Sequence, residues 1–265
     1  MPTTRPEAAA RPTVVKLGGS MLGARDTSLR DIAAARREGR PVVVVHGGGA
    51  MVSAWLERAG GRAAFVRGLR VTDAATLDVV VAVLAGVVNK QLVAELGALG
   101  APAIGLSGAD GLILQARRYD EELGYVGQIH RVNPYPVEEL LRLGYLPVLA
   151  PIAIDATASD GHRLLNTNAD TAAGELAAAL RADRLVFLTD VRGVLDAKRR
   201  LVAHATADEA RELIASGVAE GGMVPKLEAA VRAAAAGCAT SIVGAATPGA
   251  LTRALAEERI GTTIS

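Results

Sequence analysis

Aromatic residues and cysteine are scarce in this sequence. Aromatic side chains make up only 3% of its 265 residues, so few are available to stack on nucleic-acid bases. A formal net charge of +1 gives no general attraction to nucleic acids or acidic membranes. Cys238 stands alone, which excludes an intramolecular disulfide and fits a reducing cytoplasm. We expect a cytoplasmic protein with no nucleic-acid partner.

Long apolar runs are also missing. The longest dense run, Val79–Val88, has ten residues and ends at Asn89 and Lys90, so it is too short to cross a bilayer. The first residues lack the hydrophobic region of a secretion signal. We therefore expect a buried helix here and no membrane association.

No H-E-x-x-H or G-x-S-x-G motif occurs, and the four histidines are scattered along the chain. The sequence thus predicts neither a metal held by protein side chains nor a serine nucleophile. Lysine is rare as well, because only four of the 29 basic residues are lysines. Lys198, within "DAKRR", is explained as a solvated charge, whereas the sequence around Lys16 and Lys226 indicates a specific role.

Short β-rich runs alternate with helical patterns along most of the chain, which predicts an α/β fold with a mostly parallel sheet between two layers of helices. One long helix is expected between Thr72 and Gly97, with Thr72 or Asp73 as its N-cap. Its centre is apolar on all sides, and we expect a second subunit to cover it. Residues 113–131 are expected to form a β-hairpin, and residues 1–12 a disordered tail.

Two glycine-rich segments follow predicted strands: "KLGGS" with Lys16, Gly18 and Gly19, and "HGGGA" with Gly47, Gly48 and Gly49. Glycine lets the backbone approach a ligand closely, and a helix N-terminus following "HGGGA" favours an anion. Because parallel strands end at the same edge of a sheet, both segments are expected to meet around one phosphoryl group.

Polar residues cluster in two later segments. "NTNAD" places Asn166, Asn168 and Asp170 at a spacing of two, which in an extended segment puts all three side chains on one face. Asn168 or Asp170 is the expected cap of the next helix. "GGMVPK" brings Lys226 into the first turn of another helix, where a cation is unfavourable unless an anion is present.

Two further features complete the candidate site. "FLTDVRGVLD" ends a predicted buried strand with Thr189, Asp190 and Gly193. Arg70, in "GLRVTD" just before the long helix, is suited to bidentate capture of a carboxylate.

Taken in order, the motifs "KLGGS", "VVHGGG", "GLRVTD", "NKQLV", "NTNADTAAGELA", "LTDVRGVL" and "GGMVPKLEAA" resemble the amino acid kinase family, and within it the acetylglutamate kinases. The resemblance covers roughly residues 13–264. It implies a three-layer αβα sandwich around about eight strands, and phosphoryl transfer from MgATP to the γ-carboxylate of N-acetyl-L-glutamate in arginine biosynthesis.

The resemblance also implies domains and roles. Residues 13–180 would form an N-terminal lobe for N-acetylglutamate and dimerisation, and residues 181–265 a C-terminal lobe for ATP. Lys16 and Lys226 would bind the transferring phosphoryl group, organised by Asp170. The groups implied around the phosphates are Gly18, Gly19, Gly47, Gly48, Thr189, Asp190 and Gly193. Those implied around the substrate are Gly48, Gly49, Arg70, Asn166 and Asn168.

Such an enzyme needs no general base, because a carboxylate nucleophile is ionised at neutral pH. Mg²⁺ would be held mainly by the nucleotide. The segment Ser241–Gly249 and the short N-terminal tail differ from arginine-inhibited members, so a homodimer without arginine feedback is expected. Two alternatives remain open, a kinase acting on a carrier-linked substrate in lysine biosynthesis and a non-catalytic sensor. Nothing in the sequence identifies a surface for a PII-type regulator.

Overall fold

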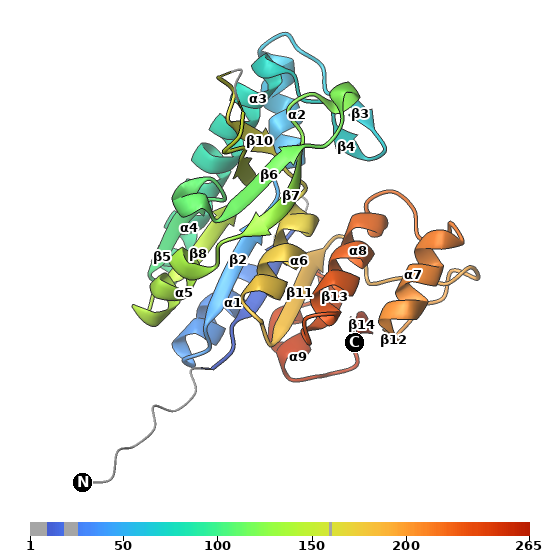
Figure 1. Cartoon of the computed structure of the whole chain (residues 1–265). Coiled ribbons are helices and arrows are strands. Elements are labelled where there is room, and N and C mark those ends of the chain that lie inside the picture. Colours follow the sequence, from blue (N-terminus) through green and yellow to red (C-terminus); the bar gives the residue numbers. More distant parts are fainter. Residues whose placement is uncertain (1–9, 19–25, 159–160) are drawn as a thin grey trace.

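A computed structural model describes residues 10–18, 26–158 and 161–265 (Figure 1). Its largest element is an eight-stranded sheet, in which every pair of neighbours is parallel except β13 and β14. In spatial order the strands are β12 (His204–Ala205), β14 (Thr262–Ile264), β13 (Ala239–Gly244), β11 (Arg184–Thr189), β1 (Thr13–Leu17), β2 (Val42–His46), β8 (Leu146–Ala150) and β5 (Ala103–Ser107). The predicted mostly parallel sheet is confirmed.

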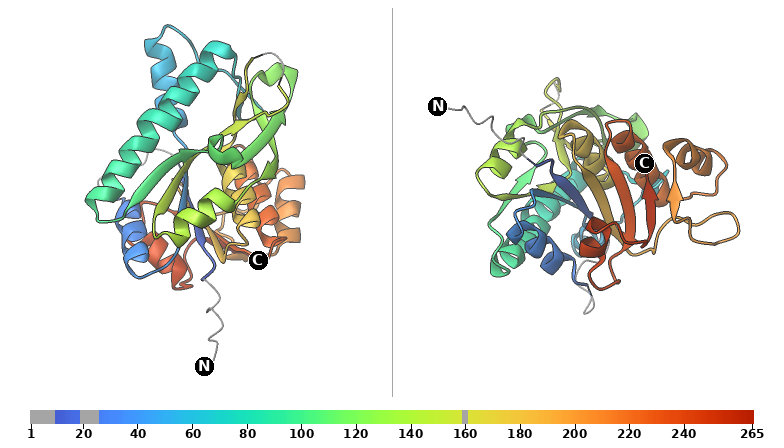
Figure 2. Two further views of the ribbon diagram at one scale, coloured as in Figure 1. Left: turned by 60° about the vertical axis from the view of Figure 1, so that its left-hand side comes forward. Right: turned by 90° about the horizontal axis from the view of Figure 1, so that it is seen from below.

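Helices cover both faces of this sheet (Figure 2). One face packs against α5 (Tyr135–Arg142), α6 (Ala169–Ala179), α7 (Ala207–Ala215) and α8 (Met223–Ala234). The other face packs against α1 (Ser28–Arg37), α4 (Asn89–Ala98) and α9 (Ala250–Leu255). The predicted layered architecture is therefore confirmed.

Alternation along the central strands decides which layer each side chain meets. Val14 belongs to the core beneath α6 and α8, whereas Val15 and Leu17 belong to the core beneath α1 and α4. Since successive side chains of a strand point to opposite faces, Lys16 lies on the same face as Val14. By the same rule His46, at the end of β2, shares its face with Val44 and α4.

The predicted long helix is present as α3 (Ala74–Val81), a π-helical stretch η1 (Ala82–Val88) and α4. Asp73 is the N-cap, and its carboxylate accepts from the Thr76 N–H. The whole helix has 25 residues with a mean hydropathy of 1.7 in its most apolar window, which is long and apolar enough to cross a bilayer. The predicted length of the helix is confirmed, whereas the ten-residue apolar run alone understated how much of it is apolar.

Burial in the fold accounts for part of that apolar character. Leu77, Val80, Val83 and Leu84 are buried, and the helix contacts α2 (Gly49–Arg58), β5 and β8. Only 33% of the most apolar window is buried within the chain, so much of its surface is uncovered.

Smaller sheets lie beyond the carboxyl ends of the central strands. One has the order β10 (Leu164–Asn166), β9 (Ile152–Ile154), β6 (Leu114–Arg118) and β7 (Gly127–Val132). β6 and β7 are antiparallel, which confirms the hairpin predicted for residues 113–131. The other is the hairpin β3 (Phe65–Val66) and β4 (Leu69–Arg70). Two 3₁₀ turns complete this region, η2 (Asp110–Leu112) and η3 (Glu121–Leu123).

The two predicted lobes share the central sheet, because β1 pairs with both β2 and β11. The boundary at residue 180 stays a prediction. Residues 1–9 of the predicted tail lie outside the described residues. The tail does not extend to Arg11, whose guanidinium donates to the carbonyls of Arg181, Ala182 and Gly237 and fixes the entry to β1.

Candidate active site

The two glycine segments meet at the carboxyl edge of the central sheet, as predicted. β1 and β2 pair in register with Leu17 opposite His46. The Gly47 N–H donates to the Leu17 carbonyl at 3.0 Å, and the Gly18 N–H donates to the Leu188 carbonyl at 3.0 Å. Gly18 and Gly47 therefore lie side by side above these strands. Gly19 lies outside the described residues.

Gly48 begins the helix that follows the second segment. Its φ of 155° disfavours a residue with a side chain, and a Cβ there would lie 2.7 Å from Leu84 Cδ2. The N-terminal N–H groups of α2 and its positive dipole end consequently lie beside Gly47 and Gly48. This combination of bare backbone and helix N-terminus suits an anion.

Lys16 and Lys226 share one carboxylate, that of Asp170. Lys16 Nζ lies 2.7 Å from Asp170 Oδ1, and Lys226 Nζ lies 3.1 Å from Asp170 Oδ2. All three side chains are about nine-tenths buried. Burial lowers the pKa of Lys16, Asp170 opposes that shift, and the Lys226 charge adds to it. Two ammonium groups and one carboxylate leave a net positive charge, which a bound anion would neutralise.

Helix packing brings these charges together. The Asn168 side chain caps α6 by accepting from the N–H groups of Asp170, at 2.8 Å, and Thr171, at 3.1 Å. α6 packs closely on α8, because a Cβ at Gly174 would lie only 2.7 Å from Ala229 Cβ. The expectation that Asn166, Asn168 and Asp170 alternate along one extended segment was wrong, since Asp170 is already helical.

Arg70 forms the opposite end of the site. Its Nη2 donates to the Gly49 carbonyl at 2.8 Å and to Ser53 Oγ at 2.9 Å, and its guanidinium stacks 4.8 Å from the Phe65 ring centroid. Nη1 is buried without a hydrogen-bond partner among the described residues. Burial lowers the pKa of Arg70. Arg70 lines the pocket, and a guanidinium whose hydrogen-bond partners are neutral oxygens is suited to bind an acceptor such as a carboxylate.

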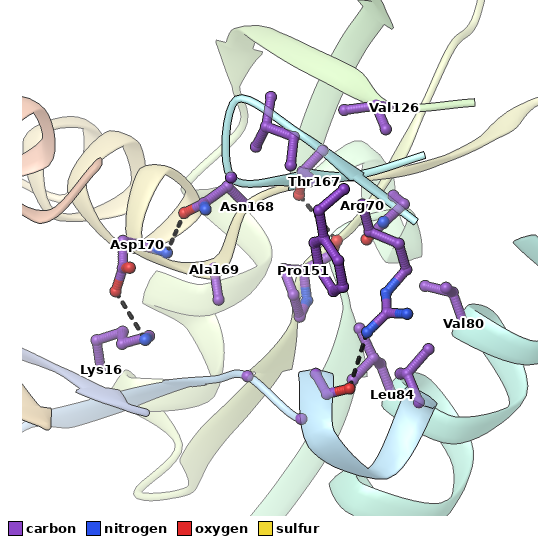
Figure 3. Close-up of a pocket in the computed structure, with 18 residues that line it drawn as sticks. Lys16, Arg70, Val80, Leu84, Val126, Pro151, Thr167, Asn168, Ala169 and Asp170 are labelled. Carbon is purple, nitrogen blue, oxygen red and sulfur yellow. Dashed lines mark hydrogen bonds and ion pairs between the residues drawn. The ribbon is translucent and has the colours of Figure 1, made fainter. Parts of the chain in front are cut away.

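A single pocket connects the two ends (Figure 3). Lys16 and Asp170 lie at one end and Arg70 at the other, with Pro151 and Thr167 between them. Apolar side chains of Val52, Val80 and Leu84 form part of the wall. The pocket can therefore hold a short molecule with an anionic group at each end.

Asn166 lies between the ends and is oriented by Thr72. The Asn166 amino group donates to Thr72 Oγ1 at 3.1 Å, and the Thr72 hydroxyl donates to the Arg70 carbonyl at 2.7 Å. Thr72 is fully buried. The amide of Asn166 is thus held in a fixed orientation along the pocket.

The candidate ATP residues lie farther from this pocket. Thr189 is buried at the end of β11, and its hydroxyl donates to Asp190 Oδ1 at 3.0 Å. Asp190 is close enough to Lys16 to favour its charged form. Gly193 packs against Thr262, where a Cβ would lie 2.7 Å from Oγ1, and none of these three residues lines the pocket.

No group of three or more histidine, cysteine or acidic side chains suited to a metal occurs in the part of the chain that the structure describes. The carboxylate nearest the lysines, Asp170, is engaged by both of them. A single carboxylate that is already paired with two lysines is suited to a metal ion held mainly by phosphate oxygens.

The amino acid kinase family model matches residues 11–244. The chain belongs to the amino acid kinase family. A relative named acetylglutamate kinase from Dehalococcoides mccartyi is 45% identical over 254 residues, which cover 95% of this chain and 93% of the relative. Another, from Synechococcus sp. (strain CC9311), is 48% identical over 251 residues, covering 92% and 87%. Family membership and these names confirm the prediction of a kinase.

Solved structures agree with this amino acid kinase fold. The smu.665 protein of Streptococcus mutans UA159 aligns with a TM-score of 0.80 and 29% identity, over 96% of this chain and 98% of that one. N-acetylglutamate synthase from Neisseria gonorrhoeae aligns with a TM-score of 0.82 and 25% identity, over 96% of this chain and 59% of that one. The predicted fold class is thereby confirmed.

Sequence reasoning missed three residues that shape the Arg70 end of this kinase. Ser53 lies one helical turn after Gly49, so helical periodicity alone would have placed it beside the glycine segment. Thr72 was considered only as a helix cap, although it orients Asn166. Nothing in the sequence indicated that Phe65 would stack on Arg70, because that contact depends on the β3–β4 hairpin.

Proposed function

We propose that this kinase transfers the γ-phosphoryl group of MgATP to the γ-carboxylate of N-acetyl-L-glutamate, as a cytoplasmic enzyme of arginine biosynthesis. The observation that carries the proposal is the pocket with the buried Arg70 at one end and Lys16 at the other, where Asp170 pairs with both Lys16 and Lys226. Identity of about 45% to relatives named acetylglutamate kinase supports the same substrate.

We assign Arg70 to the α-carboxylate, because it lines the pocket and its protein partners are the neutral oxygens of Gly49 and Ser53. One N–H of the Asn166 amide donates to Thr72, and its other N–H and its carbonyl are the groups we assign to the substrate. Gly49 lies at the same end, while Asn168 lines the pocket beside Asp170, where it caps α6. Bound in this way, the substrate directs its γ-carboxylate towards Lys16 and Gly48.

We assign Lys16, Lys226 and the N–H groups around Gly18, Gly47 and Gly48 to the phosphoryl group. In phosphoryl transfer, positioning in line and stabilising charge on the equatorial oxygens supply most of the catalysis. Asp170 holds both ammonium groups in place and leaves their net charge for the transition state. The carboxylate nucleophile is already ionised, so no base is required.

We assign the remaining nucleotide contacts to residues 181–265, with Thr189, Asp190 and Gly193 near the phosphates. Mg²⁺ bound to the nucleotide would neutralise charge on the β- and γ-phosphates. The residues that would face it are Asp170 and Asp190, neither of which belongs to a cluster that would hold the ion alone.

The test is ADP release by the purified protein with MgATP and either N-acetyl-L-glutamate or free L-glutamate, with hydroxylamine present to trap acyl phosphate as hydroxamate. Hydroxamate is expected only with the acetylated substrate, and it should be lost in Lys226→Ala. Lys198→Ala, at an exposed lysine, is the matched control.

Turnover of L-glutamate at an equal rate would contradict the proposed substrate. If neither compound supports turnover, a carrier-linked substrate or a sensor becomes the better explanation. Binding of N-acetylglutamate and MgATP by calorimetry then separates these two, because only a sensor would bind both without turnover.

We propose further that the chain is a homodimer through the helix Ala74–Ala98, whose apolar surface is only partly covered within one chain. Light scattering after size exclusion is expected to give twice the mass of 27.2 kDa. A monomer at micromolar concentration would contradict this proposal.

A further inference from the structure

His46 is a buried histidine that the proposed reaction does not use. It ends β2 immediately before the glycine segment, and only 1% of its surface is exposed. It lies on the face of the sheet opposite Lys16 and does not line the pocket. A buried titratable group next to a site, but outside it, needs its own explanation.

Asn89 fixes which nitrogen of His46 carries the proton. The Asn89 amino group lies 2.9 Å from the Val148 carbonyl and 3.2 Å from the Leu106 carbonyl, and both carbonyls can only accept. At its other end Asn89 Oδ1 accepts from Lys90 Nζ at 3.0 Å. The amide orientation is therefore set by three partners. The same amino group lies 3.1 Å from His46 Nε2 and shares its two N–H bonds among these three neighbours; an N–H on Nε2 would point at this donor, so the unprotonated Nε2 is the compatible form.

The proton of the neutral imidazole is then on Nδ1, which lies 2.9 Å from the Gly47 carbonyl. Nδ1–H donates to this carbonyl and holds the peptide between Gly47 and Gly48. In a trans peptide the N–H points away from the carbonyl, so fixing the Gly47 oxygen also fixes the direction of the Gly48 N–H. The backbone at Gly48 needs such support, because its φ of 155° is adopted mainly by glycine, whose backbone no side chain restricts.

We infer that His46 is a positioning residue that orients the Gly48 N–H towards the transferring phosphoryl group, through its Nδ1–H bond to the Gly47 carbonyl. The inference rests on the proposed function for its catalytic consequence. Burial lowers the pKa of His46 to about 4, so the required tautomer persists through the neutral range. The four groups Lys90, Asn89, His46 and Gly47 thus form one hydrogen-bonded chain from α4 to the glycine segment.

Two substitutions separate the two ring nitrogens. Asparagine places its amide nitrogen where Nδ1 lies, so His46→Asn keeps the donor to Gly47 and loses the contact to Asn89. Glutamine reaches the position of Nε2, so His46→Gln keeps the contact to Asn89 and loses the donor to Gly47. His204→Gln, at an exposed histidine on the edge strand β12, is the control.

Loss of one oriented donor to a transition state costs about 10²- to 10³-fold in kcat, and we expect misorientation of Gly48 to cost roughly tenfold or more. His46→Gln should therefore lower kcat by at least about tenfold, with KM for N-acetylglutamate changing less than about threefold. His46→Asn should restore kcat to within about threefold of the parent. Equal losses in both variants, or full activity in His46→Gln, would overturn the inference.

A second measurement depends on neither turnover nor a folded variant. Nitrogen-15 NMR of the parent protein should show His46 protonated on Nδ1, and the Gly48 amide resonance should shift on titration with inorganic phosphate. A proton on Nε2, or a Gly48 amide resonance that does not shift on addition of phosphate, would overturn the inference. An inactive parent protein with both NMR results as expected would instead count against the proposed function alone.

Discussion

Lys16 and His46 lie near the carboxyl ends of neighbouring parallel strands, yet they face opposite sides of the sheet. Both are buried, both have pKa values lowered chiefly by burial, and they are one register position apart across the β1–β2 pair. Lys16 lies on the α6 face, where Asp170 provides a counter-ion. His46 lies on the α4 face, where its partners are the neutral groups of Asn89 and Gly47.

The difference shows that the two faces of one sheet edge hold different kinds of group, a charged side chain on one face and a neutral one that binds the backbone on the other. A charged group is retained on the face that holds a carboxylate and opens into the pocket. The neutral imidazole of His46, on the other face, binds the backbone carbonyl of Gly47. The alternation of the strands, and not distance from the site, decides which of these roles a residue takes.

Arg70 combines features of both. It is a cation like Lys16, but its protein partners are neutral groups, the oxygens of Gly49 and Ser53, as the partners of His46 are neutral. No acidic side chain among the described residues pairs with this charge, as is expected of a group that binds an anionic ligand.

The largest effect is expected from Lys16→Met, which removes the charged member of the comparison. Loss of a cation that stabilises the transferring group should lower kcat by about 10²- to 10³-fold, because the remaining Lys226 then only balances the charge of Asp170. Steady-state kinetics of hydroxamate formation measures this, with Lys198→Met as the control. A loss of less than about tenfold would contradict the assigned role.

Removing the counter-ion should make Lys16 more like His46. Asp170→Asn takes away the main influence that opposes the burial shift, so the pKa of Lys16 should fall further. We expect kcat to drop by about 10²-fold and its alkaline limb to move to lower pH, since Lys16 loses its proton sooner. The measurement is kcat from pH 7 to pH 10, with Glu175→Gln on the same helix as the control. An unchanged limb would contradict this assignment.

Arg70→Lys tests whether the neutral surroundings of Arg70 serve a carboxylate ligand. Lysine keeps the charge but cannot bind Gly49, Ser53 and a carboxylate together. We expect KM for N-acetylglutamate to rise by roughly tenfold or more, while kcat changes less. Arg67→Lys, at an exposed arginine on the adjacent turn, should leave both constants unchanged. A loss confined to kcat would place Arg70 outside substrate binding.

The smallest effect concerns the neutral member of the comparison. His46 has a pKa of about 4 in the fold against 6.5 unfolded, so below pH 6.5 the unfolded chain binds a proton that the folded chain excludes. The free energy of unfolding should therefore decrease as the pH is lowered, and this group should account for roughly 2 kcal/mol of the decrease between pH 7 and pH 5. Urea titrations of the parent and His46→Asn at both values measure the difference. Equal losses in the two proteins would show that His46 does not titrate as described.

Much of the fold was predictable because strand and helix periods are local properties. The apolar runs Val42–Val45 and Leu185–Leu188 are buried on both sides, as continuous hydrophobic strands of a parallel sheet should be. The cap at Asp73 and the hairpin at residues 113–131 follow from local signals in the same way. The helix Ala74–Ala98 was predicted as well, but what covers its apolar surface stays a prediction, because that depends on what packs against it.

In the site, the charged residues were predictable from the sequence, and the residues that position them were not. The rarity of lysine pointed to Lys16 and Lys226, and the structure brings both to Asp170. Ser53, Thr72 and Phe65 act through contacts with Arg70 and Asn166 that cross between elements. The spacing of residues along the sequence does not predict contacts between separate elements.

The sequence by itself determined the alternation of strands and helices, the glycine segments and the residue types that meet an anion, because each depends on neighbours along the chain. Only the tertiary structure decided that one aspartate serves two lysines, that one guanidinium nitrogen stays unpaired, and that His46 lies behind the glycine segment. These features depend on sheet register and on the packing of α6, α8 and α4, which join residues far apart in the chain.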